Sequence, residues 1–149
     1  MAFSSVTITR SDIDSAEGST LQYHSSGTTL GLSEHDDDVL SNAKNELELD
    51  LSEKAQHLVN DEVYANATAA LDALADVDDN NMLKQLLLYK FLELFFNDDA
   101  STPESGQAQK ARQYEGKYFH YLDRTVDHLM SKLDPPQRNR SYRAMHGYG

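Results

Sequence analysis

The chain has 149 residues, which suits a single domain of ordinary size. Its 25 acidic and 13 basic residues give a net charge of −12, which repels nucleic acid and anionic membranes and argues against phosphate binding by the domain as a whole. The absence of cysteine excludes disulfide bonds and thiolate zinc sites.

The N-terminal region, residues 1–33, is rich in Ser, Thr and Gly and contains one short alternating run, Val6-Thr7-Ile8-Thr9. This composition favours an extended arm or a short pair of strands over a part of the core. The first ten residues, MAFSSVTITR, lack the basic region and apolar stretch that mark a signal peptide. We therefore expect an extended N-terminal arm over residues 1–33 and no signal peptide.

A first helix is predicted over residues 34–48, because Ser33 and Asp36 form a start signal. The pattern leaves open whether residues 50–58 extend this helix or form a connection. The apolar stripe of the helix consists of Leu40, Ala43 and Leu47. Its first turn, where the helix dipole favours negative charge, holds Asp36, Asp37 and Asp38.

A second helix is predicted over residues 59–75, where apolar residues recur at steps of three or four. Asn60 or Asp61 is expected to cap its start. Residues 76–81 break the pattern and indicate a loop. The stripe consists of Val59, Val63, Ala67, Ala70 and Leu74.

The run LKQLLLYKFLELFF at residues 83–96 is the most apolar part of the chain. It is shorter than the roughly 20 residues that a membrane crossing requires, and it carries Lys84, Lys90 and Glu93. Its apolar residues cover most of a helical circumference, and it has no Pro, Gly or β-branched residue. We therefore expect a central core helix that ends at residues 97–99.

A long helix of roughly 24 residues, about 36 Å, is predicted downstream. Gly116 interrupts it at a modest cost, and Asp134-Pro135-Pro136 ends it. Its length favours a helix that projects or spans an assembly. The stripe that defines it consists of Ala111, Tyr114, Tyr118, Leu122, Val126, Leu129 and Leu133.

The C-terminal tail, residues 135–149, reads PPQRNRSYRAMHGYG and contains no acid. Its three arginines give it a charge of +3, so the first 134 residues carry −15. A tail whose charge is opposite to that of its own domain is a candidate for docking on a neighbouring subunit. Arg and Tyr are enriched at interface hot spots, and we expect the docking residues to be Arg138, Arg140, Tyr142, Arg143 and Tyr148.

Three patterns were weighed as chemical sites, and none supports an enzyme. Asp76, Asp78 and Asn80 begin like a calcium loop, but the required glycine and glutamate are absent from its sixth and twelfth positions. Ser41 and Lys44 match a serine–lysine motif without its companion motifs. A metal on one helix face is conceivable, although a solvated face rich in ion pairs explains these residues equally well: His120, Asp123, Asp127 and His128. We assign no catalytic residue, no cofactor and no metal.

The order of these elements resembles the small head-to-tail connector (adaptor) proteins of tailed bacteriophages. An acidic helix over residues 34–48 is followed by the Ala-rich NDEVYANATAALDAL and the apolar LKQLLLYKFLELFFNDD. A polar loop, ASTPESGQ, then leads to the long helix KARQYEGKYFHYLDRTVDHLMSKLD. The resemblance covers residues 34–134 and rests on helix order and texture, with no catalytic motif to carry over.

The resemblance implies an all-α fold: a small helical bundle with a long C-terminal helix and extended N- and C-terminal arms. The arms are residues 1–33 and 135–149, and the adaptor domain is residues 34–134. It further implies a virion protein, made in the host cytoplasm, that forms a homo-oligomeric and usually dodecameric ring between the portal and the tail or neck proteins. DNA would pass through the lumen without specific binding, with Asp36, Asp37 and Asp38 as candidate acidic lumen residues.

Two other classes remain open from the sequence. An acidic regulatory protein that mimics DNA would share the negative charge, although the basic tail does not suit it. A small helical metal-binding protein would use the face that carries His120 and His128. The acidity would also follow from a high-salt habitat, in which case it says nothing about partners.

Overall fold

The structure is a computed structural model, and it describes residues 2–17, 34–99 and 106–133. These residues form α-helices and one turn of 3-10 helix, with no strand among them, which confirms the predicted all-α bundle. The elements are η1 (Phe3–Ser5), α1 (Arg10–Glu17), α2 (Glu34–Lys54), α3 (Gln56–Asn60), α4 (Ala67–Asp76), α5 (Met82–Asp99) and α6 (Gly106–Ser131).

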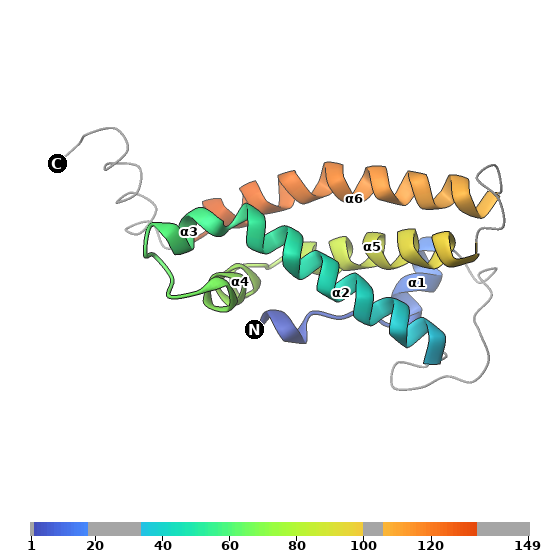
Figure 1. Ribbon diagram of the computed structural model, residues 1–149, viewed down its shortest axis with the longest axis horizontal. Coiled ribbons are helices and arrows are strands. Elements are labelled where there is room, and N and C mark those ends of the chain that lie inside the picture. The colour runs from blue at the N-terminus through green and yellow to red at the C-terminus, as the bar shows by residue number, and fades with distance from the viewer. Residues whose placement is uncertain (1, 18–33, 100–105, 134–149) are drawn as a thin grey trace.

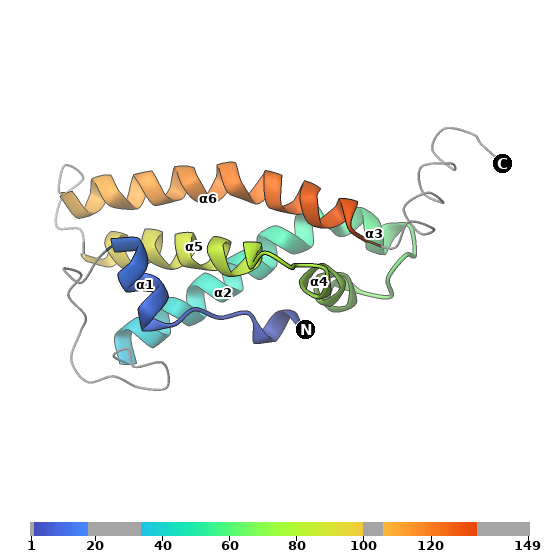
Figure 2. The ribbon, with the colours of Figure 1, turned by 180° about the vertical axis from the view of Figure 1, so that it is seen from behind.

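Helix α5 lies at the centre of the bundle, as its apolar circumference predicts. It runs beside α6 along the long axis, while α2 crosses on one face (Figure 1) and α1 lies on the other (Figure 2). A helix that is apolar nearly all round can pack against partners on several sides at once. The buried apolar residues of α5 are Leu83, Leu86, Leu87, Leu88, Phe91, Leu92, Phe95 and Phe96.

Helix α2 continues beyond residue 48 to Lys54, so the first part of the segment that the sequence left open extends the helix. Helix α5 ends at Asp99, within the expected residues 97–99. Helix α6 has 26 residues and passes through Gly116, where an added Cβ atom would meet nothing within 4 Å. The glycine therefore does not interrupt the helix. The residues on either side of it are helical, and the position itself is exposed to solvent.

The expectation of a single helix over residues 59–75 is wrong. Helix α3 ends at Asn60, and α4 begins only after Asn66, whose side chain accepts a hydrogen bond from the backbone N–H of Ala69 at 2.9 Å. Between them, Glu62 has a φ of 60°, a left-handed conformation that ends a helix. The cap of α4 is therefore Asn66 and neither of the residues expected for that role.

The expected N-terminal arm is wrong for residues 10–17, which form α1, and for its neighbour Ile8. Ile8 and Ile13 are both 0% exposed and belong to the core. Helix α1 starts at a capping box, in which the Thr9 hydroxyl accepts from the Asp12 N–H at 3.3 Å and the Asp12 carboxylate accepts from the Thr9 N–H at 2.8 Å. The remainder of that arm, residues 18–33, and the whole C-terminal arm lie outside the described residues.

No helix in the described part of the chain has the length and hydropathy that a bilayer crossing requires.

Candidate functional site

A buried ion pair lies in the middle of α5, close to both long neighbouring helices. The Lys90 Nζ donates to Glu93 Oε1 at 2.8 Å, and the two residues are only 4% and 7% exposed. The same ammonium group stands 4.2 Å from the centroid of the Tyr118 ring and 5.3 Å from that of Phe119. Two aromatic faces and one carboxylate thus replace the water that a lysine normally keeps.

Further acids surround this pair. Burial raises the pKa of Glu93, Lys90 partly offsets the rise, and the charges of Glu115 and Glu46 add to it. The Tyr118 hydroxyl donates to Asp50 Oδ2 at 2.6 Å, and burial together with this carboxylate raises the pKa of the phenol. Carboxylates from all three long helices therefore meet around one buried cation.

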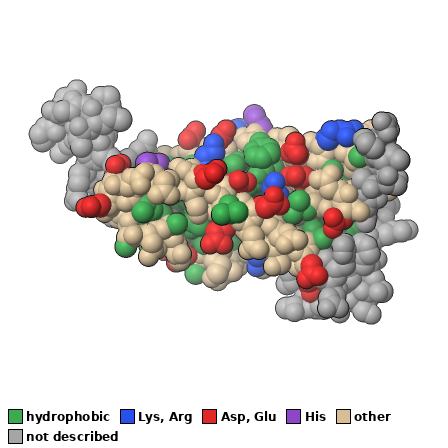
Figure 3. All heavy atoms as spheres, viewed as in Figure 1, with side chains coloured by type: hydrophobic (Ala, Val, Ile, Leu, Met, Phe, Trp, Pro, Cys, Tyr) green, Lys and Arg blue, Asp and Glu red, His purple; other side chains and the backbone are tan. Residues whose placement is uncertain are grey.

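The surface above this cluster exposes two large hydrophobic side chains. Leu49 on α2 is 67% exposed and Phe119 on α6 is 51% exposed, and they are the sequence neighbours of the bonded pair Asp50 and Tyr118. Figure 3 shows hydrophobic side chains on this face as separate islands among acidic and basic ones. We call this surface the α2–α6 seam and define it by Glu46, Leu49, Asp50 and Glu53 on α2 and Glu115, Phe119 and Asp123 on α6.

Each exposed hydrophobic residue of the seam has acids about one helical turn before and after it. Glu46 and Glu53 flank Leu49, and Glu115 and Asp123 flank Phe119. Lys54 pairs with Asp123 at 2.6 Å at one end of the seam. The seam is therefore negatively charged and carries two exposed apolar side chains, a composition that suits a partner with both cations and apolar groups.

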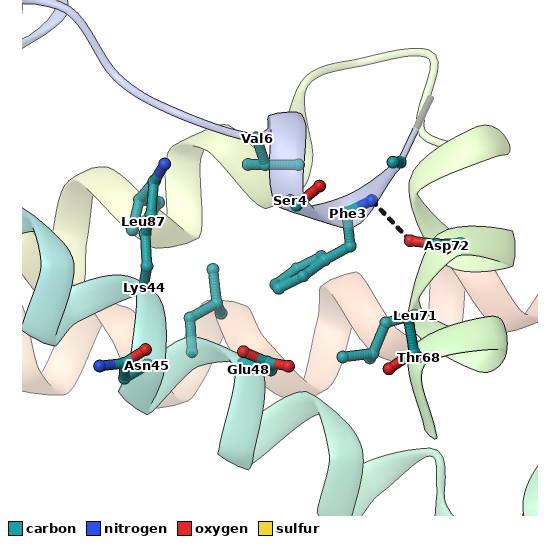
Figure 4. Close-up of a pocket in the computed structure, with 12 residues that line it drawn as sticks. Phe3, Ser4, Val6, Lys44, Asn45, Glu48, Thr68, Leu71, Asp72 and Leu87 are labelled. Carbon is teal, nitrogen blue, oxygen red and sulfur yellow. Dashed lines mark hydrogen bonds between the residues drawn. The ribbon is translucent and has the colours of Figure 1, made fainter. Parts of the chain in front are cut away.

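A separate pocket of about 280 Å³ lies between η1, α2 and α4 (Figure 4). The Phe3 side chain points into it, and the Phe3 backbone N–H donates to Asp72 Oδ1 at 2.8 Å. Its other charged groups, Lys44 and Glu48, come from α2. The pocket is where the N-terminal segment joins the bundle, and the N-terminal backbone already uses the carboxylate of Asp72.

The predicted lumen acids are Asp36, Asp37 and Asp38. All three lie near the start of α2, where Asp38 is exposed and Asp37 is half-buried, with its Oδ1 atom buried and without a hydrogen-bond partner. Only the helical backbone of Asp36 is described. The predicted docking residues Arg138, Arg140, Tyr142, Arg143 and Tyr148 lie outside the described residues.

The candidate metal ligands do not lie close together. In the described ranges, no three His, Asp or Glu side chains stand close enough together to hold an ion. Asp123 pairs with Lys54, while His120 and His128 are exposed. Asp78 caps α5, since its two carboxylate oxygens accept from the N–H groups of Met82 and Leu83, both at 2.9 Å.

Sequence reasoning missed the seam. Leu49 lies outside the apolar stripe of its helix, and Phe119 lies beside the stripe of α6 and is not part of it. One sequence feature marks both residues. Each is a large apolar side chain outside the apolar stripe of its helix, with acidic residues three or four positions before and after it.

Comparison of the chain with models of known protein families, with curated proteins and with solved structures finds no match. The features that bear on function are therefore those of the chain itself. They are the long helix α6, the acidic surface, and the two hydrophobic side chains exposed on the seam.

Proposed function

We propose that the protein is a head-to-tail adaptor of a tailed bacteriophage, a structural protein without catalytic activity. Copies of the chain form a homo-oligomeric ring, dodecameric by resemblance, between the portal and the tail or neck proteins. DNA passes through its lumen without specific binding. The order of α2, the Ala-rich α4, α5 and α6 supports this proposal, because it is the helix order on which the resemblance to connectors rests, with an Ala-rich helix that begins only at Ala67.

The observation that carries the proposal is the exposed face of α6. This helix has 26 residues, about 39 Å at 1.5 Å per residue, and packs mainly on α5, and its Phe119 side chain remains 51% exposed. Exposed aromatic residues flanked by charged groups are typical of protein–protein contacts. A ring subunit needs such surfaces, because each copy must contact the next one.

The charge distribution supports a channel role for the bundle. Outside the seam, helix α2 exposes Asp38 and Glu48 to solvent, and the whole chain carries −12. Surfaces of this sign repel the phosphate backbone and so let DNA pass without sticking.

The test is reconstitution with the portal protein of the same virus. The full chain is mixed with purified portal rings, and the complex is isolated by gradient sedimentation and imaged by electron microscopy. We expect a ring of this protein stacked on the portal. Absence of a complex, together with inhibition of a DNA-binding enzyme by the chain, would overturn the proposal in favour of the DNA-mimic alternative.

A further inference from the structure

We propose that the basic tail, residues 135–149 of one copy, docks on the α2–α6 seam of a neighbouring copy. The inference rests on the proposed function only in requiring that copies of the chain assemble with one another. It assigns a specific acceptor surface to the tail and a specific occupant to the seam.

The seam is negatively charged, whereas the tail is positively charged. In the described part of the chain, Glu46, Glu53 and Glu115 form no ion pair, and the one buried lysine nearby is already bonded to Glu93. The tail has three arginines and no acid. Arg–carboxylate pairs are frequently bidentate, which gives such a contact direction as well as attraction.

The seam also has apolar anchors that match the aromatic residues of the tail. Leu49 and Phe119 are exposed and are flanked by acids along their helices. In the sequence of the tail, Tyr142 lies between two arginines and Tyr148 follows them. An aromatic side chain packed beside Phe119 would cover apolar surface, while its hydroxyl stays within reach of water or a carboxylate. Hydrophobic and charged complementarity therefore coincide on one surface.

The tail is long enough to lie along the whole of such a seam. Residues 134–149 span up to about 50 Å when extended, whereas the stretch of α6 from Ser131 back to Phe119 is about 18 Å long. The tail follows directly after the end of α6 and begins with Pro135-Pro136, a sequence that favours an extended backbone over a helix.

Site-directed cross-linking in the full chain tests the contact. The chain has no native cysteine, so only the introduced cysteines can form a disulfide. One tagged copy carries Ala144→Cys in the tail, and an untagged copy carries Gly116→Cys, one turn before Phe119 where a new side chain meets no neighbour. The matched control acceptor is Glu48→Cys, an exposed position of α2 that lines the pocket with Phe3 instead of the seam. Because the two cysteines lie on different chains, the tagged–untagged disulfide on a non-reducing gel reports contact between copies only.

We expect the yield at Gly116→Cys to exceed that at Glu48→Cys by at least about fivefold, equivalent to roughly 1 kcal/mol of preference. Replacing the three tail arginines with glutamine, or Phe119 with glutamine, should lower the yield to that of the control. Both changes affect exposed or tail positions, and circular dichroism checks that the helices persist. Equal yields at the two acceptors, or yields that ignore the arginines, would overturn the docking site.

The two proposals can fail separately. If portal-bound rings form while the cross-link is absent, the adaptor function stands and the seam is not the acceptor. If the cross-link forms efficiently but no complex with the portal is seen, the chain self-assembles through the seam and the adaptor function is wrong.

Discussion

Lys90 is the residue whose surroundings say most about what holds the bundle together. Its ammonium group is enclosed by Glu93, Tyr118 and Phe119 in the middle of the central helix. A buried ion pair contributes little net stability over an apolar pair, yet removal of one partner leaves the other charge buried and uncompensated. Here the uncompensated group would be Glu93, which already faces the negative charges of Glu46 and Glu115.

The substitution Lys90→Met should therefore lower the free energy of unfolding at neutral pH by about 3 kcal/mol. The double variant Lys90→Met, Glu93→Leu should recover most of that loss, because neither charge remains in the interior. Urea denaturation followed by circular dichroism measures both. Lys54→Met is the matched control, since its pair with Asp123 is exposed and should contribute less than about 1 kcal/mol.

The pKa of Glu93 predicts a pH dependence with a definite sign. Burial raises this pKa above its ordinary value of 4.5, so the folded protein binds the proton more tightly than the unfolded chain. The contribution of Glu93 to stability consequently falls as the pH rises from 4.5 through the folded-state pKa. Glu93→Gln, which keeps an acceptor for Lys90, should flatten this part of the profile in urea titrations at a series of pH values.

Asp12 provides the opposite trend and an internal check. Burial acts to raise its pKa, but hydrogen bonds from Thr9 and the Lys84 ammonium outweigh burial and hold the pKa below 3.8. Its contribution is lost only as the pH falls through that lower value, outside the window of Glu93. If Glu93→Gln altered stability only below pH 3.8, the assignment of the upper window to Glu93 would be wrong.

At the scale of elements, helix ends differ from helix interiors in how well the sequence predicts them. The interior of α5 followed from its composition, because its apolar residues lie on nearly every side and most of them are buried. The break between α3 and α4 did not, because Val59, Val63 and Ala67 continue one stripe across it. The break is set by the side-chain cap of Asn66 and by the left-handed backbone of Glu62. Both are local backbone features, and the spacing of apolar residues does not reveal them.

Asp78 offers a direct measure of what one helix end contributes. Its carboxylate accepts from two backbone N–H groups at the start of α5, so Asp78→Ala should lower the free energy of unfolding by about 1 kcal/mol. The neighbouring Asp79→Ala removes the same charge from an exposed side chain that reaches Lys132 at only 3.4 Å, and should change stability little. Equal losses of stability in thermal unfolding would show that the removed charge, and not the lost cap, destabilises the Asp78→Ala variant.

At the scale of the whole molecule, the N-terminal segment is part of the bundle. The Phe3 N–H bonds to α4, Asp12 pairs with Lys84 of α5 at 3.1 Å, and Glu17 bonds to Lys110 and Tyr114 of α6. The Ser- and Thr-rich composition concealed this role, although the Thr9 and Asp12 capping box was present in the sequence. The seam was hidden for another reason: a side chain's exposure depends on which helices cover it, and only the assembled bundle shows that.

The substitution Ile13→Ala tests whether this segment stabilises the fold. Ile13 is 0% exposed within the core, so its truncation should lower the free energy of unfolding by about 2–4 kcal/mol, whereas Ile13→Val should cost about 1 kcal/mol. Urea denaturation gives both values. A loss near zero for the alanine variant would mean that the segment rests on the bundle without supporting it.

The contacts of Glu17 also set an order of events on the ribosome. Helix α1 is among the first parts of the chain to be made, but its bonding partners on α6 follow 93 and 97 residues later. At about 5–20 residues per second, the nascent segment waits on the order of 5–20 s for those partners. During that interval Ile8 and Ile13 have no complete core to enter, so their apolar side chains stay exposed until the helices that complete the core have been made.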